Sequence, residues 1–235
     1  MEFPITEQFK NFQEYIESSS IEDVLILDSN FVEPDEEFSM DYIVDFRVKK
    51  FSRLGYTDVK ERYADILNVD RFHFHAWLEI DDYASQVEFN IEKVYAGLSL
   101  INFDSKLWFQ GQSPEEMALW KTFRVLDTRP EIGDGKMAVY SIREGISPPN
   151  EPTIYYIDRA ACWKTSLTFA QYYEAVLDMI GISDWQLLFA DISWNDPEVE
   201  DYYPELKQSL EALAKAFPDK DYSKYIELLE ARWVI

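Results

Sequence analysis

TIYYIDRAACWKTSLTFAQYYEAVLDMIGISDWQLLFAD, residues 153–191, is the stretch that decides the fold. Its first six residues, 153–158, are mostly β-branched and aromatic, which predicts a short strand, and a second extended run follows over 161–167. Thr168, with Gln171 three positions later, has the pattern of a capping box. A helix should therefore begin directly after the second extended run.

This helix should have one apolar face and a defined end. Its apolar side chains recur at the spacing of a single helical face; they are Phe169, Tyr172, Tyr173, Val176, Leu177 and Ile180. Gly181 should close the helix, because glycine takes the left-handed backbone conformation without a steric penalty. The resulting strand, strand and helix unit indicates how the chain packs and does not by itself indicate any chemistry.

The overall composition indicates a folded, strongly acidic protein. The chain has 235 residues, of which 47% are hydrophobic, so it can bury a sizeable core as one large domain or as a domain with an appended subdomain. Its 45 acidic and 22 basic side chains give a net charge of −23. Such a field repels nucleic acid and anionic lipid and speeds encounter with a basic partner. Alternatively, the charge only keeps an aromatic-rich protein soluble.

Several classes of protein are disfavoured by the sequence. A single cysteine, Cys162, excludes an internal disulfide and a cysteine-based zinc cluster and fits a reducing compartment. The N-terminal residues are acidic where a signal peptide needs a basic patch, and no apolar run reaches membrane-spanning length. No Gly-rich phosphate loop, GxSxG elbow, HExxH or EF-hand loop is present. We therefore expect a cytoplasmic protein that has no cofactor and binds neither membranes nor nucleic acid.

The rest of the chain predicts an α+β fold with a central, mostly antiparallel sheet flanked by helices and a C-terminal helical hairpin. A main domain over 1–191 should carry a helical extension, 192–235, packed on it. The individual predictions are helices over 6–17, 57–67, 114–126, 206–217 and 222–235 and strands over 40–51, 71–80, 83–95 and 137–142. The apolar run 21–27 fits a strand or a helix equally well.

The two histidines of the chain suggest one candidate metal site. His73, His75 and Glu79 would share one face of the predicted strand over 71–80, because alternate strand residues point to the same side. Two imidazoles and a carboxylate could hold a metal, although a catalytic metal normally needs about three protein ligands. The alternative is that these histidines are ordinary residues on the outer face of a sheet. We expect no metal here.

Two stretches, 33–42 and 194–205, combine carboxylates with aromatic rings. Charge steers a basic partner toward a surface, and aromatic side chains often supply most of the binding energy. The alternative is two solvated loops with a few rings that face the core. The residues predicted to bind a partner are Asp35, Glu36, Glu37, Phe38, Trp194, Asp196, Glu198, Glu200, Asp201 and Tyr202.

The central unit also resembles a known family. Its segments YYID, TSLTF, FAQYYEAVLDMIG and DWQLLFAD, all within residues 153–191, are similar to the C-terminal part of the SUKH superfamily. This resemblance implies an α+β domain with a largely antiparallel sheet. It also implies a non-enzymatic binder, which in bacteria is typically a cytosolic immunity protein that neutralises a toxin, often a basic nuclease.

Charge and resemblance together give the leading functional hypothesis. We expect a non-enzymatic protein, such as an immunity protein, that blocks a basic partner through an acidic, aromatic surface. One alternative is a metal-dependent enzyme that uses His73, His75 and Glu79. Another alternative is a regulatory scaffold for a neutral partner, in which the charge serves solubility alone.

Overall fold

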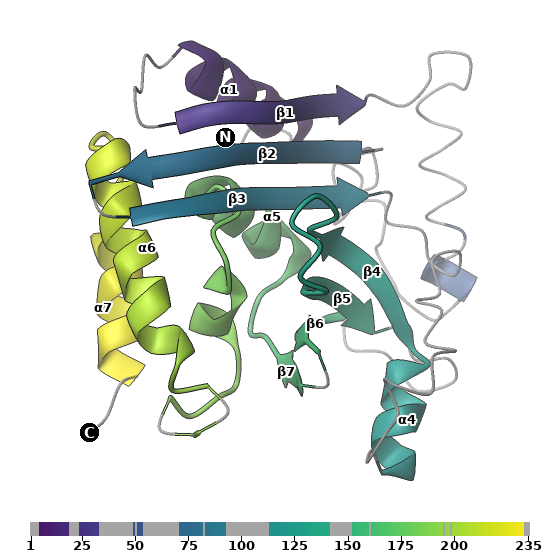
Figure 1. The fold of residues 1–235 in the computed structure, drawn as a ribbon. Coiled ribbons are helices and arrows are strands. Elements are labelled where there is room, and N and C mark those ends of the chain that lie inside the picture. The colour runs from purple at the N-terminus through teal and green to yellow at the C-terminus, as the bar shows by residue number, and fades with distance from the viewer. Residues whose placement is uncertain are drawn as a thin grey trace.

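A seven-stranded antiparallel sheet forms the centre of the computed structural model, and its strands follow one another in chain order (Figure 1). The structure describes residues 5–18, 24–32, 49, 51–53, 71–81, 83–92, 113–141, 152–159, 161–194, 196–197 and 199–232. The strands are β1 (Val24–Val32), β2 (Arg71–Ile80), β3 (Tyr83–Glu92), β4 (Phe123–Thr128), β5 (Met137–Ser141), β6 (Thr153–Asp158) and β7 (Ala161–Lys164). The predicted α+β fold with an antiparallel sheet is confirmed.

Helices flank this sheet on one face and along one side (Figure 1). Helices α1 (Ile5–Ser18) and α5 (Phe169–Met179) lie behind β1 to β3. Helices α6 (Tyr202–Ala216) and α7 (Ser223–Arg232) form the C-terminal hairpin beside the ends of β2 and β3. The short helices α4 (Pro114–Trp120) and η1 (Trp185–Phe189) precede β4 and follow α5.

Aromatic side chains fill the space between the sheet and the helices. Phe72 of β2 lies 4.1 Å, centroid to centroid, from Phe9 of α1, and Phe74 stacks on Phe89 of β3 at 5.6 Å. The ring of Tyr173 on α5 meets Phe9 edge to face. Such pairs stabilise a core beyond the area that they bury. The alternation along β2 therefore places its phenylalanines in the core, as the sequence predicts.

The C-terminal helices belong to the same hydrophobic core as the sheet. Leu206, Leu210 and Leu213 of α6 are at most 1% exposed and lie in one buried cluster with Phe72 and the rest of the β2 face. Leu229 of α7 joins the same cluster. Residues 192–232 are thus held by apolar contacts to the sheet and to α5.

The capping box predicted before α5 is confirmed. The backbone N–H of Gln171 donates to the Thr168 hydroxyl, and the Gln171 side chain accepts from the Thr168 N–H at 3.0 Å. The helix then ends as expected, with Gly181 at a φ of +74°. The sequence did not indicate that Ile180 also has left-handed backbone geometry.

Two other predictions for local structure are wrong in part. The helix predicted over 114–126 is wrong beyond Trp120, because residues 123–128 form β4 and pair with β5, so sheet pairing overrides the helical pattern. The strand predicted over 40–51 is wrong at residues 49 and 51, which are helical, and its other residues lie outside the described part of the chain. The helix predicted over 57–67 also lies outside it. Of the ambiguous run 21–27, residues 24–27 form the start of β1, and residues 21–23 lie outside the described part of the chain.

Gly181 is needed for a second reason, a close backbone approach to β3. The Glu88 N–H donates to the Gly181 carbonyl at 3.0 Å. A Cβ atom on Gly181 would lie 2.6 Å from the carbonyl carbon and oxygen of Glu88. Real Cβ atoms do not come so close, so an alanine would push the end of α5 away from the sheet.

We expect Gly181→Ala to lower the free energy of unfolding by about 3–5 kcal/mol, through left-handed strain and the backbone clash together. Gly135→Ala is the matched control, because Gly135 has a similar φ of +79° but a Cβ atom added to it would meet no other atom within 4 Å. Its cost should be about 1–2 kcal/mol. Urea unfolding of both variants measures the difference, and equal losses would show that the close approach to Glu88 is unimportant.

A buried carboxylate lies where the two halves of the sheet meet. Among the described residues, strands β3 and β4 pair at Asn90 with Thr128 and at Ile91 with Asp127. Asp127, 3% exposed, accepts a hydrogen bond from the Asn90 N–H at 2.9 Å and another from the Tyr172 hydroxyl of α5 at 2.7 Å. Burial raises the pKa of Asp127 to about 6, although these two hydrogen bonds oppose the shift.

The raised pKa makes a prediction about stability and pH. The folded state holds the Asp127 proton more tightly than the unfolded chain, where the pKa is 3.8. Its contribution is therefore complete below about pH 4 and is lost as the pH rises through about 6, a change of about 3 kcal/mol at most. We expect the stability of the native chain relative to Asp127→Asn to fall over this range. Thermal unfolding of both proteins from pH 4 to 7 tests this, and a constant difference would contradict it.

Candidate functional site

The predicted binding segment 194–205 forms a looped connection that leads into α6. Trp194 is only 1% exposed, so the prediction that it is a surface anchor for a partner is wrong. Its ring instead meets Tyr203 edge to face at 6.2 Å and belongs to the core. Val199 is equally buried, at 1%. These two side chains anchor the segment to the domain.

In contrast to Trp194 and Val199, the described carboxylates of the segment are exposed to solvent. Asp196, Glu200 and Asp201 are exposed, as is Glu205 in the first turn of α6, which the sequence analysis did not single out. Among the ion pairs of the described residues, Glu200, Asp201 and Glu205 have no partner. We call Asp196, Glu200, Asp201 and Glu205 the acidic surface.

The other predicted binding residues cannot be placed on this surface. Glu198 lies outside the described residues, and so do Asp35, Glu36, Glu37 and Phe38 of the first acidic stretch. The acidic surface therefore rests on the second stretch alone.

Backbone hydrogen bonds fix the shape of the segment that carries the acidic surface. The N–H groups of Val199 and Glu200 both donate to the Asp196 carbonyl at 2.9 Å, and the Tyr202 N–H donates to the Val199 carbonyl at 3.1 Å. Successive turns of this kind, with buried side chains between them, hold the exposed carboxylates in set positions. A surface that is ordered before binding loses less conformational entropy when a partner arrives.

Tyr202 connects the acidic surface to a buried polar cluster. Its hydroxyl donates to Asp158 Oδ2 at 2.5 Å. Lys136 Nζ lies 2.7 Å from Asp184 Oδ2 and 3.7 Å from Asp158 Oδ2, and the Tyr156 hydroxyl donates to Asp184 Oδ1 at 2.7 Å. These five residues, the Lys136 cluster, come from four separate parts of the chain. Of these five residues, the sequence analysis singled out only Tyr202, and it did not predict the cluster.

The two tyrosines of the Lys136 cluster act as permanent hydrogen-bond donors. Burial, and then the negative charge of Asp184, raises the pKa of Tyr156 well above its ordinary value. Burial and the hydrogen bond to Asp158 likewise raise the pKa of Tyr202. Both hydroxyls therefore stay protonated at physiological pH, and the cluster fastens the start of α6 to β6.

The candidate metal ligands are not brought together. His73 is 2% exposed, with Nδ1 3.1 Å from Asp28 Oδ2 and Nε2 3.0 Å from Glu88 Oε1. His75 instead contacts Gln86, and Glu79 accepts a hydrogen bond from Trp77. Within the part of the chain that the structure describes, no three His, Cys, Asp or Glu side chains are arranged to hold a metal ion.

Glu88 is a buried hydrogen-bond partner of His73. Burial would raise the pKa of Glu88, but hydrogen bonds from His73 and from the N–H groups of Ile132 and Glu131 outweigh it, and the pKa is lowered. A charged Glu88 facing one ring nitrogen and Asp28 facing the other suit a doubly protonated imidazole. His73 thus joins β2 to β1 and β3, and Glu88 joins β3 to the turn after β4.

Cys162 has the properties of a structural thiol. Burial, together with the nearby charge of Glu116, raises its pKa to about 12. A nucleophilic cysteine needs a stabilised thiolate, which this environment disfavours.

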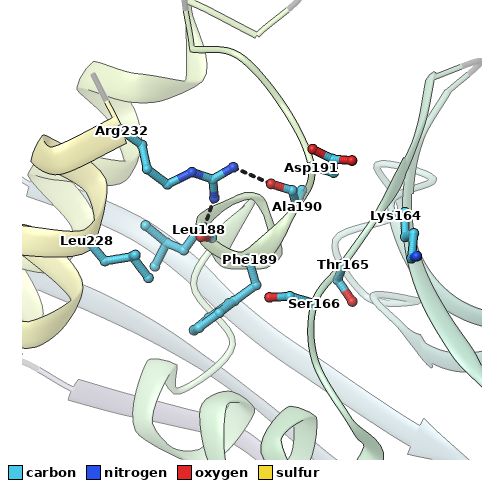
Figure 2. A pocket seen from close by; sticks show the side chains of 9 residues that line it. All are labelled: Lys164, Thr165, Ser166, Leu188, Phe189, Ala190, Asp191, Leu228 and Arg232. Carbon is cyan, nitrogen blue, oxygen red and sulfur yellow. Dashed lines mark hydrogen bonds between the residues drawn. The ribbon is translucent and has the colours of Figure 1, made fainter. Parts of the chain in front are cut away.

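The best-formed cavity among the described residues, about 490 Å³, lies between the end of β7, η1 and α7 (Figure 2). Arg232 of α7 points its guanidinium toward the end of η1, where it donates to the Leu188 carbonyl at 2.6 Å and to the Ala190 carbonyl. The cation is thus used to cap the turn. The Thr165 hydroxyl is likewise bonded to the Ile154 carbonyl.

We expect Lys136→Met to lower the free energy of unfolding by about 3–5 kcal/mol, because it leaves the buried carboxylates of Asp184 and Asp158 without their cation. Lys207→Met is the control, since Lys207 pairs with Glu230, which is 49% exposed, and should change stability little. Urea unfolding measures both, and a small loss in Lys136→Met would mean that the Lys136 cluster does not hold α6 in place.

Comparisons with known proteins identify no relative of this chain. In the described residues no helix is long and apolar enough to cross a bilayer. No family model matches the chain, and neither a curated protein nor a solved structure matches it.

Proposed function

We propose that this chain is a non-enzymatic protein-binding domain whose acidic surface captures a basic protein partner. The observation that carries the proposal is the contrast within one short segment. Buried Trp194 and Val199 hold it to the core, while the carboxylates of Glu200, Asp201 and Glu205 face solvent without a cation of the described chain beside them. Leaving like charges together costs stability, which a basic partner would recover.

Aromatic contacts beside the acidic surface fit the same role. Tyr202 and Trp163 meet edge to face at 6.4 Å, and both side chains are partly exposed. Rings of this kind supply apolar contact next to steering charges in protein interfaces. The partner would thus meet a rim of carboxylates around a small aromatic centre.

The partner that best fits is a toxin neutralised in the cytoplasm. The net charge of −23 favours a basic protein, such as a nuclease whose own surface binds nucleic acid. The resemblance of residues 153–191 to the SUKH superfamily supports an immunity protein. The metal-enzyme alternative loses support, because the structure pairs His73, His75 and Glu79 with different neighbours.

The test is capture of proteins from a lysate of the native cell at low and at moderate salt, followed by mass spectrometry. The variant Glu200→Lys, Asp201→Lys, Glu205→Lys should retain the basic partner at least about tenfold less well than the native chain. The control variant Glu7→Lys, Glu14→Lys, Glu17→Lys makes the same charge change on exposed positions of α1.

The two variants separate a local surface from a general charge effect. If the α1 variant loses the partner to the same extent, the net charge and not the acidic surface is responsible. If neither variant differs from the native chain, or if the native chain retains no basic protein at low salt, the proposal is wrong.

A further inference from the structure

A small polar cavity opens beside the acidic surface. It has a volume of about 260 Å³ and lies between the start of β3, the loop before η1 and one side of α6. Its lining is Tyr83, Ala84, Ser85, Ser183, Asp184, Glu205, Gln208 and Ser209. Glu205, Gln208 and Ser209 come from adjacent turns of α6, three and four positions apart, so they share one side of that helix. Glu205 belongs to both the cavity and the acidic surface.

The hydroxyl groups of the cavity present acceptors. Ser209 donates its only hydroxyl hydrogen to the Glu205 carbonyl at 2.9 Å, because a carbonyl can only accept. The 2.9 Å contact between Tyr83 and Ser209 must then have Tyr83 as its donor. Ser85 likewise donates to the Gln86 carbonyl at 3.2 Å. The oxygens of Tyr83 and Ser85 therefore have free lone pairs and no hydrogen left to donate.

The charged and amide side chains of the cavity also provide acceptors. Glu205 contributes an exposed carboxylate, and Gln208 contributes an amide whose oxygen accepts. Asp184 is already satisfied by Lys136 and Tyr156, so it adds little net charge. A ligand that suits this cavity must be cationic and carry several donors. The side-chain donors of the lining are the Gln208 amide and the Ser183 hydroxyl, and an anion that used them would also meet the Glu205 carboxylate.

We propose that this cavity receives a guanidinium group, supplied by an arginine of the basic partner. A guanidinium has five donors in a plane, no acceptor and a weaker hydration shell than an ammonium, so it matches acceptors spread over β3 and α6 better than a lysine does. This inference rests on the proposed function, since it names the side chain that the acidic surface recognises, and it makes Ser85 and Gln208 determinants of specificity.

The probe is the capped peptide Gly-Gly-Arg-Gly-Gly, titrated into the isotope-labelled native chain and followed by amide chemical shifts. We expect a dissociation constant of about 1–10 mM, because one side chain supplies the contact. The shifts should lie at β3 and α6 residues of the cavity. The same peptide with citrulline, which has the same shape without the charge, should bind at least about tenfold more weakly, and the lysine peptide about threefold more weakly.

Two variants locate the probe. Glu205→Gln should weaken arginine binding about fivefold by removing the carboxylate. Gln208→Trp places a large ring at an exposed helix position beside the cavity and should abolish the binding. Glu211→Gln removes a carboxylate from an exposed position farther along α6 and should leave it unchanged. Unfolding curves confirm that all three variants are folded.

The proposal is overturned if the arginine peptide does not bind at 20 mM, roughly twice the weakest constant expected. It is also overturned if citrulline binds as well as arginine, or if Glu205→Gln and Gln208→Trp both bind as the native chain does. Any of these results would refute the guanidinium site but would not contradict partner capture by the acidic surface. Conversely, if the chain binds the arginine peptide but retains no basic protein, the guanidinium site is supported and the proposed function is refuted.

Discussion

The carboxylate of Asp127 is the constraint on which the arrangement of this fold depends. Among the described residues, strands β3 and β4 pair at Asn90 with Thr128 and at Ile91 with Asp127, and the Asp127 side chain adds further contacts at this point. Asp127 adds a hydrogen bond to β3 and another to Tyr172 of α5, and Gln186 in turn donates to the Tyr172 hydroxyl. One buried acid thus aligns the two halves of the sheet with the central helix α5.

Acidic side chains in this protein fall into two groups with different roles. Glu88, Asp127, Asp158 and Asp184 are at most 5% exposed, and each is bonded to a partner from a distant part of the chain. They specify how strands and helices meet. The carboxylates of Glu200, Asp201 and Glu205 are exposed and form no ion pair with the described residues. The net charge of −23 therefore combines acids that specify the fold with acids that face solvent.

Local features were predictable from the sequence, and long-range polar contacts were not. The capping box at Thr168 and Gln171 and the alternation of Phe72 and Phe74 depend on neighbours within a few residues, so their patterns are visible in the chain. Lys136 and Asp184 lie 48 residues apart, and Tyr172 and Asp127 lie 45 apart, so nothing local marks them as partners. Trp194 was misjudged for a related reason: an acidic neighbourhood suggests exposure, but an indole is large enough to reach the core from such a segment. The sequence therefore indicated which segment carries the acidic surface, but it did not indicate the cavity beside that surface.

Strand order has a consequence for synthesis on the ribosome. Because the sheet is a meander, β2 and β3 can pair as soon as residues 71–92 have emerged, and their inner face carries Phe72, Phe74 and Phe89. Helix α5, whose Tyr173 closes that aromatic layer, is complete only at Met179. At ordinary translation rates this delay lasts roughly 4–17 s. Helix α1 precedes the hairpin and can cover these rings with Phe9 and Phe12, so only the side of the aromatic layer that Tyr173 closes stays open until α5 is complete.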